Sequence, residues 1–298
     1  MKKLFLLSIV IISLSNRAFA FAENATHGYP NCMSCHVAPS GGGLLNDYGR
    51  SLSKELMSTW GWKNSEQPLF GAMKNTANTK FGGDFRAIQT YYESDQVKQG
   101  KQFVMQKNVE IGVQYSKLWF VATLGTQEGP KEIPTKGKFL SERHYLLWNV
   151  SDDSKIKVGK FRLNFGLNDP NHTRVTKQPL GFGPNSESYI MEFSHFTEDG
   201  ELFISSDLGR IDLPKSKNVE KSISSSYSRY ISEKAKIGAS ILLGESELKR
   251  RSLTGTNGVI GFFDKNIIKY EVDLERSSFS STTNKSQYQL AGNISWGV

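Results

Sequence analysis

The sequence predicts a mainly β fold, an antiparallel β-barrel of about 12 strands preceded by a small helical segment. Three observations lead to this prediction. Apolar and polar residues alternate from about residue 80 to the end of the chain, as they do in strands with one apolar face. The connections between the alternating runs are mostly long at one end and short at the other. A compact stretch with helical spacing lies ahead of the runs.

Residues 1–20 have the pattern of a secretory signal peptide. Lys2 and Lys3 precede the apolar stretch Leu4–Ile12, and Ala18-Phe19-Ala20 matches a small-x-small cleavage site. The apolar stretch is shorter than the roughly 20 residues that a membrane-spanning helix needs. We therefore expect these residues to direct export and then to be removed.

Residues 21–75 form the second predicted unit, a monohaem cytochrome c segment. Cys32, Cys35 and His36 make a C-x-x-C-H sequence, the attachment signature for c-type haem. Two thiols three positions apart can each add to a vinyl group of one porphyrin, and the adjacent histidine can then bind the iron. The sequence thus predicts one covalent haem c, with His36 as its proximal ligand.

Other uses of this motif fit the sequence less well. The chain has only two cysteines, so a zinc site would lack its second ligand pair, and no βαβ pattern surrounds the motif to indicate a redox dithiol. A lone disulfide remains an alternative. Export favours haem, since haem is attached to such proteins outside the bacterial cytoplasm.

The rest of this segment is predicted to cover the haem. Apolar residues at spacings of three and four predict an amphipathic helix over Leu44–Trp60. The Gly-rich stretch Pro39–Gly43 is either an ordinary flexible loop or a place where backbone approaches the cofactor closely. His27 and Met57 are the main candidates for the distal iron ligand, with Met73 a further one and a five-coordinate iron the alternative.

Residues 80–298 are predicted to form a transmembrane β-barrel. Its runs are expected near 81–92, 102–116, 117–127, 139–150, 155–166, 188–198, 200–208, 220–231, 235–246, 251–263, 266–277 and 285–298. The links after odd-numbered runs are mostly long and polar, and those after even-numbered runs are tight. That asymmetry is typical of outer-membrane barrels, whose extracellular loops are longer than their periplasmic turns. An even number of strands would place both ends of the barrel, and the haem segment, on the periplasmic side.

The alternative is a soluble β-sandwich, which would not require this loop asymmetry. Aromatic residues make up 11% of the chain, enough to form girdles at both membrane interfaces. The formal net charge is +8 at pH 7, but no basic run exceeds Lys249-Arg250-Arg251. This charge distribution argues against nucleic-acid binding.

A signal peptide, a minimal C-x-x-C-H segment and a barrel together resemble the fused monohaem cytochrome–porin proteins, of which outer-membrane iron oxidases are the best known. The resemblance covers the whole layout, but its sharp part is Cys32–His36 with the following Asn46-Asp47-Tyr48-Gly49-Arg50. It implies thioether bonds at Cys32 and Cys35, His36 as proximal ligand, and electron transfer through the outer membrane. The Pro39–Gly43 insertion and the shorter barrel depart from the iron-oxidase pattern.

Gly159–Thr173 also resembles porin-like barrels, where a strand leads into a Gly-rich, His-containing loop. The connection Leu167–Glu187 is the longest in the chain, and we expect it to be the loop that folds inward. His172, Arg174 and Lys177 would then line a pore or meet a ligand; the alternative is a solvated, mildly basic loop.

Three functions follow from these features. The first is electron transfer between an extracellular donor or acceptor and periplasmic carriers, with metal oxidation as one redox activity of this kind. The second is a porin gated or sensed by a haem plug. The third is a soluble periplasmic cytochrome with a β-rich partner domain. The sequence predicts outer-membrane lipid as a partner for the first two and offers no hydrolytic or group-transfer centre.

Overall fold

The computed structural model describes most of the chain. The described residues are 25, 27–29, 31–53, 64, 67–126, 138–168, 175–177, 179–183, 186–212, 219–263, 266–279 and 286–297. The predicted signal peptide lies outside them, as do Met57, His172 and Arg174.

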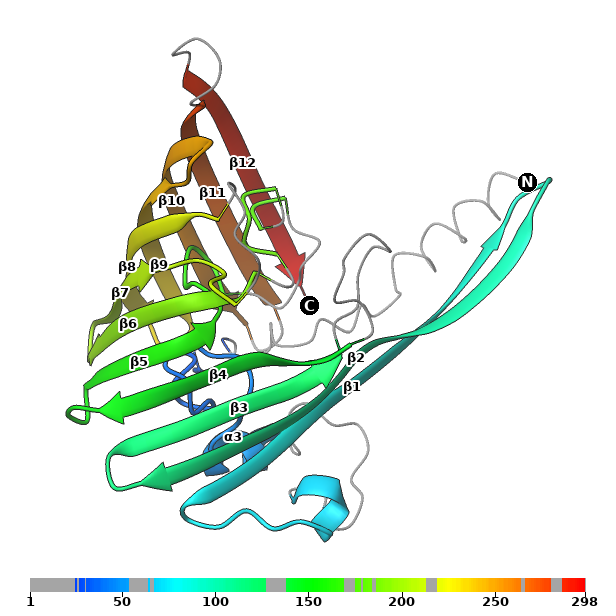
Figure 1. Ribbon diagram of the computed structural model, residues 1–298, viewed down its shortest axis with the longest axis vertical. Helices are drawn as coiled ribbons and strands as arrows, with labels where there is room; N and C mark the ends of the chain where they lie inside the picture. Colours follow the sequence, from blue (N-terminus) through cyan, green and yellow to red (C-terminus); the bar gives the residue numbers. More distant parts are fainter. Residues whose placement is uncertain are drawn as a thin grey trace.

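Twelve antiparallel strands form one curled sheet in which each strand pairs with its neighbours in sequence (Figure 1). In chain order they are β1 (Thr79–Glu93), β2 (Lys98–Tyr115), β3 (Leu118–Thr126), β4 (Phe139–Asn149), β5 (Ser154–Phe161), β6 (Ser188–Thr197), β7 (Gly200–Asp207), β8 (Lys221–Ser232), β9 (Ala235–Glu245), β10 (Lys249–Phe262), β11 (Asn266–Phe279) and β12 (Ser286–Gly297).

The strands agree with the predicted runs in number and order, and two connections differ. The predicted long link Glu93–Lys101 is wrong, because β1 and β2 continue to a tight turn where the Ser94 N–H donates to the Val97 carbonyl at 2.8 Å. The run predicted over 155–166 ends at Phe161, after which the chain turns toward the concave side. The alternation of apolar and polar residues does not show where β1 and β2 meet or where β5 ends.

The described residues do not close a barrel. β1 and β12 are the two edges of the sheet, with no pairing between them in the ranges that the structure describes. The prediction of a closed barrel is therefore not confirmed. A period of two determines which face a side chain occupies, whereas closure depends on the tilt and stagger of every strand.

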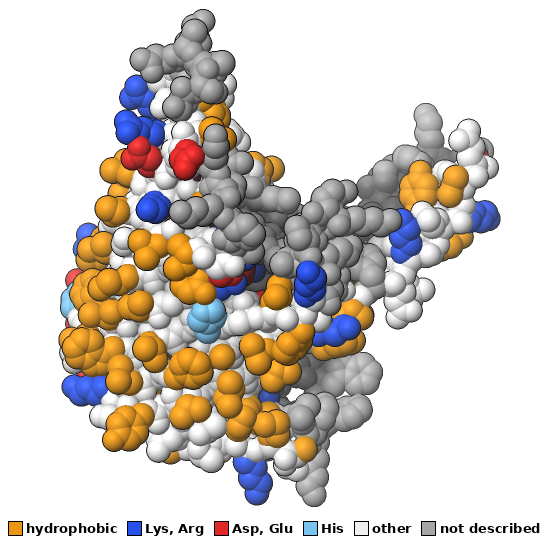
Figure 2. Space-filling view, viewed as in Figure 1, with side chains coloured by type: hydrophobic (Ala, Val, Ile, Leu, Met, Phe, Trp, Pro, Cys, Tyr) orange, Lys and Arg blue, Asp and Glu red, His pale blue; other side chains and the backbone are white. Residues whose placement is uncertain are grey.

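The two faces of the sheet are reversed relative to a soluble protein. Along most strands, buried polar residues alternate with exposed apolar ones: Glu192 is 0% exposed, whereas Ile223 is 64% and Leu290 is 72% exposed. Hydrophobic side chains cover the outer surface in front of β3–β7 (Figure 2). An apolar exterior with a polar interior is the arrangement of a membrane barrel wall.

The described helices are short. A 3-10 helix, η2, spans Pro68–Gly71, and the α-helix α3 spans Asp47–Leu52. No described helix has the length and hydrophobicity to cross a membrane. The segment containing α3 lies behind β3–β5, on the concave side of the sheet (Figure 1).

Candidate functional site

The C-x-x-C-H residues form one compact turn. The N–H groups of Cys35 and His36 both donate to the Cys32 carbonyl, at 3.3 and 3.1 Å. Both thiols are free and half-buried, so the lone-disulfide alternative is not what the structure has. The turn therefore holds two available thiols next to a histidine.

Two asparagines fix this turn. The Asn31 side chain accepts hydrogen bonds from the Ser34 N–H at 3.0 Å and the Ser34 hydroxyl at 2.7 Å. The Asn46 amide donates to the Met33 and Ser34 carbonyls at 3.3 and 3.0 Å, and its oxygen caps α3 by accepting from the Gly49 N–H at 2.7 Å. Asn46 thus connects the attachment turn to the helix.

Gly49 explains why helix and turn can approach so closely. A Cβ built at Gly49 would collide with the backbone of Cys35. The Asn46–Arg50 sequence, which is part of the family resemblance, therefore has a physical role. Asn46 provides the hydrogen bonds, and Gly49 provides the space.

The predicted helix over Leu44–Trp60 begins later than expected. Leu45 forms an isolated β-bridge with His36, and α3 starts at Asp47 after its Asn46 cap. The pairing of residues 36 and 45 takes priority over helical spacing because it satisfies backbone groups on both sides of the loop. Leu44 is buried as predicted, but Tyr48 is 49% exposed. The part of this helix beyond residue 53 lies outside the described residues.

The His36 ring is poised as a neutral ligand. Its Nδ1 is buried and has no hydrogen-bond partner among the described residues. Burial lowers the pKa of His36, although the Gly43 carbonyl acts in the opposite direction. A neutral imidazole with an unused nitrogen is the form that binds a metal.

Burial also raises the pKa of both cysteine thiols. Near Cys32, the Lys236 ammonium lowers the pKa and the Glu201 carboxylate raises it, each less than burial does. The donor set, two free thiols and a neutral histidine on one turn, therefore fits the covalent haem that the sequence predicts. His27 is exposed, and nothing in the described residues tests it or Met57 as the distal ligand.

The Gly-rich loop has a defined shape. Gly41, Gly42 and Gly43 have φ angles of +78°, +76° and +67°, a left-handed conformation that disfavours other residues. A Cβ at Gly41 would lie 2.8 Å from Cys32 Cβ, and one at Gly43 would lie 3.0 Å from a Glu110 oxygen. The ordinary flexible loop does not fit this shape. The groups that the glycines approach are Cys32 and the sheet, and their approach to a cofactor stays a prediction.

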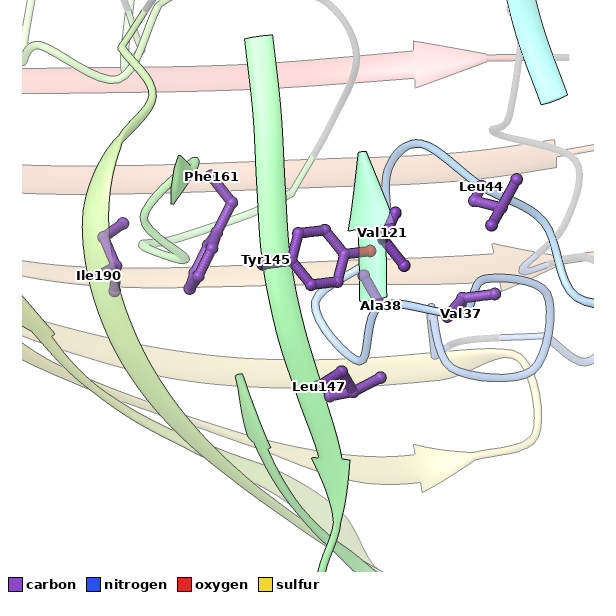
Figure 3. Packing of buried hydrophobic residues seen from close by; sticks show 8 residues of the cluster. All are labelled: Val37, Ala38, Leu44, Val121, Tyr145, Leu147, Phe161 and Ile190. Atoms are coloured by element: carbon purple, nitrogen blue, oxygen red, sulfur yellow. The ribbon is translucent and has the colours of Figure 1, made fainter. Parts of the chain in front are cut away.

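Apolar packing attaches this segment to the concave face. Val37, Ala38 and Leu44 share a buried cluster with side chains from β3, β4, β5 and β6 (Figure 3). Those partners are Val121, Tyr145, Leu147, Phe161 and Ile190. The cluster holds the attachment turn against the inner wall.

A buried polar contact lies beside this cluster. Lys157 Nζ donates to Ser40 Oγ at 2.6 Å and pairs with Glu192 at 2.7 Å, and all three residues are buried. Nearby, Arg143 pairs with Glu110 at 3.1 Å beneath the glycine loop. The loop is thus positioned by charged groups of β2, β4, β5 and β6.

The other side of the turn faces β7–β9. A small cavity there is lined by Cys32, Glu201 and Lys236, and Lys236 Nζ pairs with Glu201 at 2.7 Å. A second cavity lies between the glycine loop and β3–β5, and both cavities share Ser40, Asn164 and Asn168. The segment therefore has wall contacts or cavities on two sides.

The connection after β5 folds inward, as predicted. The described part of Leu167–Glu187 packs against the inner face near β9–β11, where Leu180 joins a cluster with Phe165, Leu242, Leu253 and Ala291. Lys177 is buried and pairs with Glu271 at 2.9 Å. The solvated-loop alternative is thus wrong for Lys177.

The inward loop, whose described residues are 162–168, 175–177, 179–183 and 186–187, reaches the haem segment. The Asn168 amide donates to the Ser40 carbonyl. This contact joins the two inserts inside the curled sheet. The main partners of Ser40 are Lys157 and Glu192. Neither was among the predicted site residues, because no sequence pattern connects positions that far apart.

Comparisons with known proteins bear on the fold. No family model and no curated protein matches this chain. Among solved structures, the outer-membrane channel DcaP of Acinetobacter baumannii is 10% identical, with a TM-score of 0.50 over 75% of each chain. OmpT of Vibrio cholerae, outer-membrane expressed, is 8% identical with a TM-score of 0.41, covering 75% of this chain and 84% of that one. The trimer form of in-vitro folded OmpT is 9% identical with a TM-score of 0.44, covering 73% and 82%. The likeness to DcaP shows that this chain has the fold of an outer-membrane β-barrel protein.

Proposed function

We propose that this chain is an outer-membrane protein that carries one covalent c-type haem on the inner side of its β wall. In this proposal it passes electrons between an extracellular donor or acceptor and periplasmic carriers. That is the activity of the fused monohaem cytochrome–porin proteins that the sequence resembles.

One observation carries the proposal: the C-x-x-C-H turn is held against the polar inner face of a sheet whose outer face is apolar. A haem attached there would supply one-electron transfer. The residues of the chain position it, since Asn31 and Asn46 fix the turn and Ser40 fixes the adjacent loop to β5 and β6.

The topology supports a proposal for the side of the membrane from which the electron carriers approach. β1 begins and β12 ends at the same end of the sheet as the short turns, such as Ser116-Lys117 and Asp199-Gly200. Short turns face the periplasm in outer-membrane barrels. Periplasmic carriers would therefore approach from the end where the haem segment enters, and an extracellular partner from the end of the inward loop.

The first test is haem attachment in a host that matures c-type cytochromes. We expect one haem mass adduct and a c-type absorption band, weakened in Cys32→Ala and Cys35→Ala. His36→Ala should keep the adduct and change the iron coordination. Ser34→Ala is the matched control, because it lies within the motif and removes only the hydroxyl bond to Asn31, while the backbone bonds of residue 34 to Asn31 and Asn46 remain. Wild-type protein without a haem adduct would refute the cofactor.

The second test concerns location and electron flow. We expect recovery in the outer-membrane fraction, and reduction of the haem from either side of proteoliposomes. Recovery in the soluble periplasmic fraction would favour a soluble cytochrome, although so apolar an outer face does not suit one.

A porin gated by its plug is the second candidate, favoured by the Asn168–Ser40 contact between the two inserts. Deleting the apex of the inward loop separates the two functions. Electron transfer predicts a changed rate for external donors with haem content intact. A gate predicts changed ion conductance, with reduction only from the periplasmic side.

A further inference from the structure

Basic side chains that face the interior are paired with acids. In the part of the chain that the structure describes, these pairs include Lys80–Asp47, Arg143–Glu110, Lys157–Glu192, Lys160–Asp212, Arg162–Glu187, Lys177–Glu271, Lys236–Glu201, Lys249–Glu275 and Arg251–Glu220. The interior is therefore nearly neutral, pair by pair. An acid without a base stands out against this background.

Asp273 on β11 is such an acid. It is 0% exposed, and neither carboxyl oxygen has a hydrogen-bond partner among the described residues. Its neighbours on the same face, Glu271 and Glu275, are also buried but fully engaged. Glu271 accepts from Lys177, Thr176 and the Leu167 N–H, and Glu275 pairs with Lys249 and Arg251.

No described group donates a hydrogen bond to the Asp273 carboxyl, and the Lys177 ammonium, which is paired with Glu271, acts on it only through space. The partners of Asp273 across the sheet are Gly255 on β10 and Ala291 on β12, and its carboxyl lies over Gly255, where any Cβ would collide with it. Ala291 belongs to the apolar cluster that contains Leu180 of the inward loop. Leu180 is itself 0% exposed, so the loop shields this part of β11 and its neighbours from water.

Each charged group near Asp273 is already committed. On β11 these are the two carboxylates, on the loop Lys177, and on β10 Lys249 and Arg251, all in the pairs given above. A bound metal ion would find one free carboxyl, and no cluster of three His, Cys, Asp or Glu suited to a metal occurs in the described ranges. An ionised Asp273 would be a third negative charge in one row and would have no hydrogen-bond donor, which is unfavourable for a buried carboxylate.

We propose that Asp273 is a proton-binding site, protonated at mildly acidic pH, and that its proton keeps the inward loop closed against β9–β12. This inference rests on the barrel part of the proposed function and does not require the haem. When the pH rises and the proton leaves, the carboxylate needs water, and the apolar cluster that contains its neighbour Ala291 and Leu180 of the loop keeps water away from this part of the wall. The loop around Leu180 must then lift, which opens the interior next to β10–β12.

The test uses the full-length protein in detergent or lipid. Chymotrypsin cuts after leucine and phenylalanine, so cleavage at Leu180 and Phe182 reports on the lifted loop. We expect wild type to be cut about tenfold faster than Asp273→Asn at about pH 9, and equally slowly at about pH 6. Comparing both proteins at one pH removes the enzyme's own pH dependence. Glu245→Gln, which removes the carboxyl of an exposed ion pair on β9, should behave as wild type.

Infrared spectroscopy tests the proton directly. Wild type at about pH 6 should show the carbonyl stretch of a protonated carboxyl, and this band should be missing from Asp273→Asn. Asp273→Ser is a second neutral variant, should the first fail to fold. A missing band in wild type would overturn the inference, as would equal cleavage of wild type and variant at high pH. Neither result would affect haem attachment, so the two proposals can fail separately.

Discussion

Both inserts pack on the inner wall through an apolar cluster, and they differ in their polar anchors. The haem segment, residues 31–53, docks on β3–β6 through an apolar cluster and one buried ion pair at Ser40. The inward loop docks on β9–β11 through hydrogen bonds and an ion pair that converge on Glu271.

Because of this difference, the attachments of the two inserts should respond to different substitutions. Apolar burial is insensitive to pH and weakly affected by salt, so it would suit a segment that holds a cofactor, as we propose for residues 31–53. A buried charged anchor leaves an unpaired charge when one partner is removed, so the attachment of the inward loop should be sensitive to the loss of Lys177. The predictions that follow separate these two kinds of attachment.

The largest effect is expected from Lys177→Met. The variant leaves Glu271 buried without its cation, so the opening free energy of the inward loop should fall by about 3–5 kcal/mol. Hydrogen exchange of residues 175–183 measures this opening free energy. Exchange of residues 31–53 should not change, and a loss of protection in both inserts would show that they open as one unit.

Leu44→Ala should have the next largest effect, now on the other insert. Leu44 is 1% exposed and packs in the cluster with Val121 and Leu147, so the haem segment should lose about 2–5 kcal/mol of local stability. Hydrogen exchange over residues 31–53 gives the value. Protection around Leu180 should remain, and the effect should be equal at high and low pH.

Gly41→Ala should cost about 1–2 kcal/mol, because the left-handed φ is strained for alanine. A Cβ there would also contact the Cys32 sulfur at 2.9 Å. We therefore expect less haem attached per chain, measured as the ratio of haem absorbance to protein mass. Gly100→Ala in the β1–β2 hairpin, where a Cβ would meet only Tyr91 at 4.0 Å, is the control and should attach haem normally.

The smallest effect is expected from Glu93→Gln at the hairpin tip. Its pair with Lys98 is exposed on both sides, so its removal should leave the stability almost unchanged. A thermal melt measures the change. A larger loss would mean that exposed pairs matter as much as the buried pairs behind both inserts.

The strands could be predicted because alternation survives along them. On β11, Glu271, Asp273 and Glu275 alternate with the exposed Val272 and Leu274, and such a pattern indicates a strand wherever it occurs. The sequence could not show that β1 and β12 stay apart, or that the β1–β2 link is a tight turn. Those features depend on how strands tilt and extend together.

The attachment turn could be located from its spacing, but its supports could not. Asn46 and Gly49 act through hydrogen bonds and space, which only coordinates reveal. The contact of Ser40 with Glu192 joins positions 152 residues apart. Asp273 looked like any acid of an alternating run, and it becomes unusual only when each neighbour's partner is known.

The strictly sequential order of the strands has a consequence for how the chain folds. Each strand pairs only with the one before and the one after it, so the wall can grow hairpin by hairpin from local contacts, which form fast. The haem segment is made first in the chain, yet its partner Glu192 lies on β6 and the Lys236 near Cys32 lies on β9. Its docking must wait until more than half of the wall exists. The earliest part of the sequence is therefore among the last to reach its final place.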